Sequence, residues 1–124
     1  MKRIITVFPG LLLLLAITPL TAAEKPTCKE LGAAFNMIVT NPLTKQNFSE
    51  VVGKALYANN LLTSKTGKTL TEQDAIEHIA KQSAYDPLHY SLFLIRDLTG
   101  SLKEQSCTYS NKPLVFEGTR ISSD

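Results

Sequence analysis

His78 and His89 are the residues of this chain most able to bind a metal or to transfer a proton. Glu77 is next to His78 and Asp86 precedes His89 by three residues, so two imidazoles and one carboxylate could form a metal site. His78 falls on a different side of its predicted helix from the apolar residues, however, and nothing in the spacing directs it toward His89. We therefore expect exposed or core-edge histidines, and we assign no metal ligand, no catalytic residue and no cofactor.

Cys28 and Cys107 lie near opposite ends of the predicted helical region. Neither belongs to a Cys-x-x-Cys pair, and no histidine cluster accompanies either of them, which argues against redox catalysis and metal binding. In an oxidising compartment an even pair of cysteines most simply forms a disulfide. We predict the bond Cys28–Cys107, which closes a loop of about 80 residues and stabilises the fold by roughly 4 to 5 kcal/mol in the chain-entropy model.

The segment Thr66-Gly67-Lys68-Thr69 matches the last part of a phosphate-binding loop. The complete motif requires a glycine five residues before Gly67, and Leu62 occupies that position. Residues 63–69 are polar and without periodicity, which indicates a flexible loop, and we expect no nucleotide. The Gly-x-Ser-x-Gly pattern of a hydrolase nucleophile does not occur either.

Three aromatic residues, Tyr85, Tyr90 and Phe93, cluster around the start of the fourth predicted helix. Exposed aromatic side chains are typical of protein-binding surfaces, so these three are our candidate partner-binding residues. The alternative is that they fill the core, because the helix is strongly apolar.

Residues 1–23 have the three parts of a secretory signal peptide. Lys2 and Arg3 give a basic start, an apolar stretch follows, and Thr21-Ala22-Ala23 supplies small residues for cleavage after Ala23. A membrane span needs about 20 apolar residues, and prolines and a glycine interrupt this shorter run. A short basic start with a compact leucine run is typical of bacteria, so we expect a periplasmic protein, or alternatively a secreted one, without a membrane span in its mature form.

The mature chain, residues 24–124, is long enough for a single small domain. Removing residues 1–23 takes away Lys2 and Arg3, which reduces the 13 basic residues to 11, against 11 acidic ones, so the formal charge becomes zero. Nucleic-acid binders carry a basic excess, and anionic membranes attract polybasic patches. This balance argues against both kinds of partner.

The periodicity of apolar residues predicts an all-α fold, a small bundle of about four helices closed by the disulfide. The helices are expected over residues 28–39, over 48–62, from just after Thr71 to 83 or 84, and from Pro87 onward. Capping pairs mark their starts: Thr27 with Glu30, Asn47 with Glu50, Thr71 with Asp74, and Asp86 before Pro87.

Two of these helices have apolar stripes that we expect to face the core. On the third helix Ile76, Ile79 and Ala80 face inward. The stripe of the fourth and most buried helix is Leu88, Leu92, Ile95, Leu98 and Leu102.

The C-terminal part, residues 108–124, has a different pattern from the helices. Leu114-Val115-Phe116 is expected to form one short strand or an extended segment laid over the helices. The last four residues, Ile121 to Asp124, are expected to be loose.

The segment Thr27-Cys28-Lys29-Glu30-Leu31 resembles the first helix of the small, disulfide-linked, all-helical acid-stress chaperones of the bacterial periplasm. The resemblance covers five residues. In that family the two cysteines lie much closer together, whereas 78 residues separate them here, so we do not assign the chain to that family.

These observations lead us to expect a small exported helical protein that acts by binding another envelope or exported protein. It would be an accessory part of a secretion or conjugation system, an inhibitor or immunity protein, or a chaperone. The alternative is a small exported enzyme or toxin that acts in the cell envelope through His78, His89 and nearby carboxylates. A helical bundle hosts many functions and does not choose between these classes.

Overall fold

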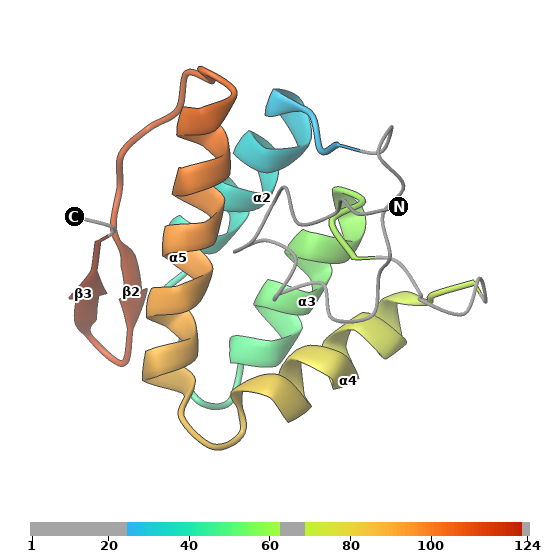
Figure 1. Ribbon diagram of the computed structural model, residues 1–124. Coiled ribbons are helices and arrows are strands. Elements are labelled where there is room, and N and C mark those ends of the chain that lie inside the picture. The colour runs from blue at the N-terminus through green and yellow to red at the C-terminus, as the bar shows by residue number, and fades with distance from the viewer. Residues whose placement is uncertain (1–24, 63–68, 123–124) are drawn as a thin grey trace.

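The computed structural model describes residues 25–62 and 69–122. The predicted signal peptide, residues 1–23, and most of the predicted loop at 63–69 lie outside these ranges. The described part contains four helices, α2 (Cys28–Val39), α3 (Phe48–Ala58), α4 (Glu72–Ser83) and α5 (Pro87–Glu104), followed by strands β2 (Leu114–Phe116) and β3 (Thr119–Ile121). The β hairpin lies beside α5, and α3 and α4 lie on the other side of that helix (Figure 1). None of the described helices is long and apolar enough to cross a bilayer.

Two helices begin at the capping boxes that the sequence predicts. Thr27 accepts a hydrogen bond from the backbone N–H of Glu30, whose carboxylate accepts one from the N–H of Thr27, and this backbone hydrogen bond lowers the pKa of Glu30. Thr71 and Asp74 make the same reciprocal pair at the start of α4. Each box satisfies two backbone donors that a helix N-terminus would otherwise leave unpaired.

The start of α3 differs from the prediction. Asn47 makes no capping bond to the helix; its side chain instead accepts from the backbone N–H of Thr44, while the Thr44 hydroxyl accepts from the N–H of Asn47. The reciprocal pair therefore stands one turn earlier than expected. Glu50, the predicted box partner, pairs with Lys54 on the helix surface at 3.0 Å.

The end of α3 is also earlier than the predicted residue 62. Asn60 adopts a left-handed backbone conformation with φ of 59°. Its N–H donates to the carbonyl of Tyr57, and the N–H of Leu61 donates to the carbonyl of Leu56. These two bonds form a Schellman motif, which satisfies the last carbonyls of the helix and turns the chain away.

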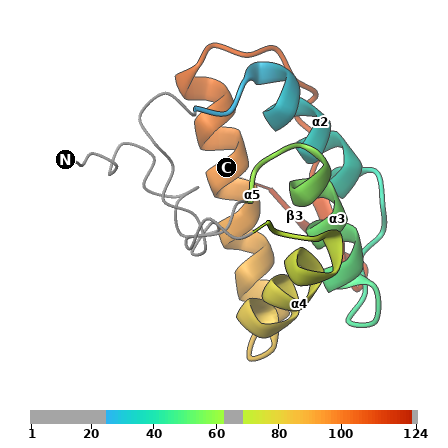
Figure 2. The ribbon, with the colours of Figure 1, turned by 90° about the vertical axis from the view of Figure 1, so that its right-hand side faces the viewer.

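The helices α3 and α4 pack side by side (Figure 2). Gly53 makes the close approach possible, because a Cβ atom at this position would lie 2.7 Å from the Cα atom of Ile76. Ala75 and Ile79 of α4 are fully buried, Ile76 is half-buried, and Ala80 is exposed. The prediction that Ala80 faces inward was therefore wrong: the buried side of α4 is centred on Ala75 and Ile79.

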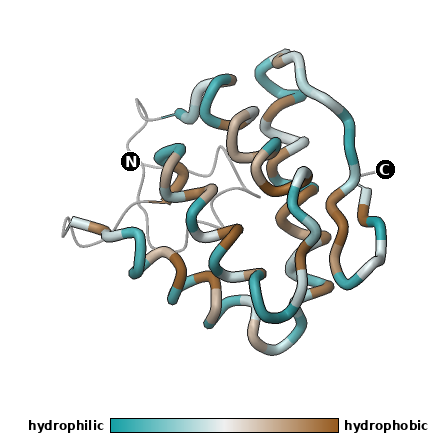
Figure 3. Tube along the Cα trace, turned by 180° about the vertical axis from the view of Figure 1, so that it is seen from behind, coloured by the Kyte–Doolittle hydropathy of each residue, from teal (hydrophilic) through white to brown (hydrophobic). Residues whose placement is uncertain are grey.

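One hydrophobic core receives side chains from all four helices and from both strands. Apolar and polar residues alternate along the helices, whereas β2 is apolar throughout (Figure 3). On α5 the structure buries Ile95, Leu98 and Leu102 as predicted, whereas Leu92 is half-buried and Leu88, in the first turn, is exposed.

Small polar residues occupy several buried positions of α5. The hydroxyls of Ser91 and Thr99 donate to the carbonyls of Pro87 and Ile95, four residues earlier, at 2.8 Å. Buried hydroxyls are tolerated when they are hydrogen-bonded in this way.

The C-terminal segment is a hairpin and not the single strand or extended segment that the sequence suggested. Leu114 pairs with Ile121 across two antiparallel strands, and Ile121, which we expected to be loose, is buried. Glu117 and Gly118 form the turn with φ values of 50° and 82°, as a tight hairpin turn with two left-handed residues requires. Leu43 bridges to the outer side of β2 through backbone bonds to Val115 and Glu117. The fold is thus mostly helical with a small sheet, where all-α was expected.

Candidate functional site: the exposed face of α5

The turn between α4 and α5 fixes where the longest described helix begins. Asp86 caps it, with its Oδ1 atom accepting from the backbone N–H of His89 at 3.0 Å, and Pro87 occupies the first helical position. Proline suits that position because its missing N–H would have no helical partner and its φ is already helical. This start determines which residues of α5 face the core and which face solvent.

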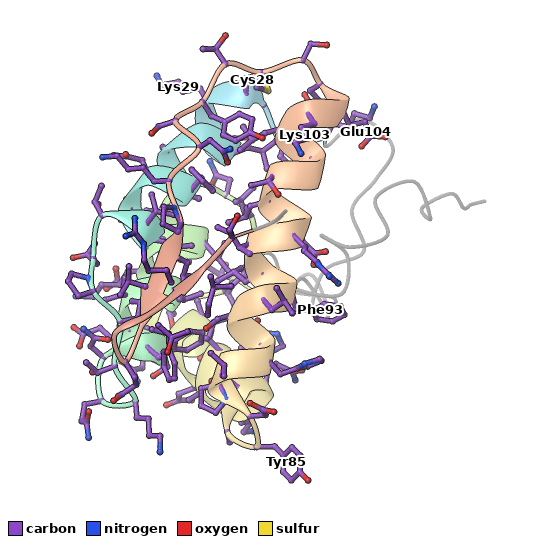
Figure 4. All side chains as sticks on the ribbon, turned by 90° about the vertical axis from the view of Figure 1, so that its left-hand side faces the viewer. Cys28, Lys29, Tyr85, Phe93, Lys103 and Glu104 are labelled. Atoms are coloured by element: carbon purple, nitrogen blue, oxygen red, sulfur yellow. A yellow bond between two sulfur atoms is a disulfide. The ribbon has the colours of Figure 1, made fainter. Side chains whose placement is uncertain are left out.

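The three aromatic residues predicted to bind a partner do not lie together. Tyr85, in the turn, is 99% exposed and Phe93 is 39% exposed, whereas Tyr90 is mostly buried. The ring of Tyr90 packs edge-to-face on Phe48 of α3, and Phe48 packs in the same way on Phe116 of β2. Figure 4 shows Tyr85 at one end of α5 and Phe93 projecting away from the core. Binding by Tyr85 and Phe93 remains a prediction, while Tyr90 contributes to packing.

The exposed side of α5 carries a line of five residues that we call the α5 outer face: His89, Phe93, Arg96, Gly100 and Lys103. Their spacing alternates between four and three residues, so they follow one side of the helix over about 21 Å. His89 and Phe93 are neighbours, with ring centroids 6.0 Å apart. Leu88, which is 46% exposed, and Tyr85 lie at the N-terminal end of this line.

A shallow pocket of about 340 Å³ adjoins Tyr85. The start of α3 and the end of α4 form its walls, and its lining residues are Lys45, Phe48, Ser49, Ala80, Ser83, Ala84, Tyr85 and Pro87. The lining mixes apolar surface with hydroxyls and one lysine. The hydroxyl of Ser83 is already used, because it donates to the carbonyl of Ile79.

Tyr90 and Asp97 form a polar pair at the edge of the core. They are seven residues apart and therefore lie on the same side of α5, two turns from each other. The Tyr90 hydroxyl and the Asp97 Oδ2 atom are buried and make no hydrogen bond within the described residues. Burial raises the pKa of Asp97 to about 7, and burial together with the nearby Asp97 carboxylate raises the pKa of Tyr90. Sequence reasoning missed this pair, because an aspartate on a helix normally lies at the surface.

The disulfide lies at the opposite end of α5 from Tyr85 (Figure 4). Cys28 and Cys107 are bonded as predicted, with their Cα atoms 5.5 Å apart. A Schellman motif ends α5: Ser106 has a φ of 56°, and the N–H of Cys107 donates to the carbonyl of Leu102. This turn brings Cys107 back toward the first residue of α2. The Gln105 side chain, which donates to the carbonyl of Pro26 at 2.9 Å, adds a second link between the two segments.

The two histidines lie on different helices, His78 on α4 and His89 on α5. No group of three or more histidine, cysteine, aspartate or glutamate residues in the described ranges could hold a metal ion. The partial phosphate-loop pattern at Thr66-Gly67-Lys68-Thr69 lies outside the described residues except for Thr69.

No protein-family model matches the chain, and comparisons with curated proteins and with solved structures find no match either.

Proposed function

We propose that this protein acts outside the cytoplasm by binding another protein, and that the start of α5 and its outer face make the contact. The supporting observation is that most of the exposed large apolar side chains lie near the start of α5. Among the described residues four large apolar side chains are exposed, and three of them, Tyr85, Leu88 and Phe93, lie on the turn before α5 or within its first two turns. Large apolar side chains gathered at one place on a surface are typical of interaction sites.

The proposal of an extracytoplasmic location, in the periplasm or secreted, is supported by the pattern of residues 1–23 and by the disulfide, since disulfides persist in oxidising compartments. The mass of the protein recovered from the periplasm or the medium tests it. We expect the mass of residues 24–124 with one disulfide. Recovery of the intact chain from the cytoplasm with two free thiols would contradict the proposal.

The binding proposal is tested by crosslinking in the envelope, with the full chain expressed from its own N-terminus. Phe93→Ala and Leu88→Ala should each reduce capture of a specific partner by about tenfold, as expected when an anchoring side chain is lost. Met37→Ala is the matched control, because Met37 is exposed to a similar degree, 37%, but lies on α2. Tyr90→Ala is unsuitable as a probe, because it removes a ring that packs on Phe48. Equal capture by all of these variants would show that the α5 surface is not the binding site.

A further inference from the structure

We propose that the segment recognised by the α5 outer face is an acidic amphipathic helix, with a row of apolar side chains flanked by aspartate or glutamate. This inference deepens the proposed function and rests on it. It is carried by two observations on α5, the spacing of its exposed residues and the sign of the charges on its outer face.

The spacing favours a helix as the bound segment. His89, Phe93, Arg96, Gly100 and Lys103 repeat at intervals of four, three, four and three residues, which is the spacing by which one helix contacts another along its length. At Gly100 an added Cβ atom would meet nothing within 4 Å, so this position is an open notch between Arg96 and Lys103. A large apolar side chain of the bound helix could enter the notch while the two cations flank it.

The charges favour an acidic segment. The two charged residues of the α5 outer face, Arg96 and Lys103, are both basic, and Glu104, an exposed acid at the last position of α5, is next to Lys103 but outside this line. Asp86 is engaged as the helix cap, and Asp97 is part-buried at the edge of the core. Neither Arg96 nor Lys103 forms an ion pair with another described residue, so both are available to a partner's carboxylates. Complementary charge across an interface chiefly sets specificity and the rate of association.

An anionic membrane is the other surface that an apolar and basic helix face could bind. Membrane-binding patches generally contain about four to eight lysines or arginines, and the α5 outer face has two. The observations therefore favour a protein segment over a membrane, and vesicles serve as the competing arm of the test.

The test uses two synthetic helices of about 18 residues, long enough to cover the α5 outer face. Both carry the same leucine stripe; glutamates flank it in one and lysines in the other. Each is titrated into the isotope-labelled, oxidised full chain while the backbone amide signals of α5 are followed by NMR. We expect the glutamate helix to bind at least about tenfold more tightly, and we expect its advantage to shrink as salt rises from about 0.05 to 0.5 M.

Arg96→Glu should reverse the preference between the two helices. Arg120→Glu is the matched control, because it makes the same charge change at an exposed position on β3. Circular dichroism establishes that both variants remain folded. Equal binding of the two helices, no binding of either, or equal effects of the two variants would overturn the inference. Binding to vesicles of phosphatidylglycerol without binding to the glutamate helix would assign the face to a membrane.

Capture of the natural partner by these variants distinguishes a failure of this inference from a failure of the proposed function. If Phe93→Ala abolishes capture but Arg96→Glu and high salt do not weaken it, α5 is the binding site and the acidic-helix inference is wrong. If Phe93→Ala has no effect, the proposed function itself fails.

Discussion

Asp97 should make the folded protein less stable as the pH rises toward neutrality. Burial raises the pKa of this carboxyl group from its ordinary value of 3.8 to about 7 in the folded state. Between these two pH values the folded state holds a proton that the unfolded state has released, so the free energy of unfolding falls with increasing pH. A pKa difference of this size corresponds to about 4 kcal/mol for a fully buried group. Because Asp97 is only part-buried, solvent screening should reduce the effect to about 1 to 2 kcal/mol.

The variant Asp97→Asn removes the ionisation while keeping the size and shape of the side chain. At about pH 7.5 it should raise the free energy of unfolding by about 1 to 2 kcal/mol, and at about pH 4 it should change little, since the wild-type carboxyl is then protonated in the folded state. Urea unfolding of the variant and the wild type, monitored by circular dichroism at the two pH values, measures both differences in the free energy of unfolding. Tyr90→Phe is the companion variant: it deletes a buried hydroxyl without a hydrogen bond within the described residues and should be neutral or stabilising by up to about 1 kcal/mol.

Two results would refute this reasoning. If Asp97→Asn destabilised the protein at neutral pH, the ionised carboxylate would have to make a favourable interaction that outweighs the cost of its burial. If the variant had the same effect at both pH values, the change would come from packing and not from the proton.

Three further predictions concern stability. Gly53→Ala should destabilise the protein by about 1 to 3 kcal/mol in urea unfolding, because the new Cβ atom must displace the backbone of Ile76; an unchanged midpoint would mean that α3 and α4 separate easily. Cys28→Ser should lower stability by about 2 to 5 kcal/mol in thermal unfolding, and equal melting temperatures under oxidising and reducing conditions would contradict it. Thr44→Ala should lower the free energy of unfolding by about 1 kcal/mol, because Thr44 forms the reciprocal hydrogen-bonded pair with Asn47. Glu50→Ala should change it by no more than about 0.5 kcal/mol. A larger effect of Glu50→Ala than of Thr44→Ala would show instead that Asn47 and Glu50 form the cap, as the sequence predicted.

Local signals in the sequence predicted the helices well where a single turn contains all the information. The boxes at Thr27 and Thr71 and the Asp86-Pro87 start each depend on residues within three positions of one another, so the sequence of one turn is enough to predict them. The pattern at Asn47-Glu50 looked equally good, but Thr44 competes for the same asparagine. Sequence alone does not rank two overlapping caps, because both satisfy the same spacing rule.

Long-range packing decided what the local patterns could not. The hairpin was missed because its strands have three residues each, and the burial of Ile121 depends on contact with a distant part of the chain. Leu88 continues the apolar period of α5, but the contact that the first turn makes with α3 goes through Tyr90, which packs on Phe48, and Leu88 stays exposed.

The candidate site was predicted in part. Aromatic composition pointed to the correct end of α5, but only the structure separates Tyr85 and Phe93, at the surface, from Tyr90, which packs on Phe48. The residues of the α5 outer face follow a spacing of three and four residues that can be read in the sequence. It becomes recognisable only when the structure shows which side of α5 is exposed.

The bond between Cys28 and Cys107 divides the chain into a covalent ring and a tail. All four described helices belong to the ring, because the bond joins the first residue of α2 to the segment just after α5. A protease that cuts once anywhere inside the ring leaves two pieces that remain attached, so a nicked molecule cannot lose a helix. The hairpin, in contrast, belongs to the tail. After one cut behind Cys107, only non-covalent contacts would hold it: packing on the helices and the backbone hydrogen bonds of Val115 and Glu117 to Leu43. The two parts of this small protein therefore differ in their response to a single cleavage: the disulfide keeps the helical pieces covalently joined, whereas the hairpin loses its covalent connection to the helices.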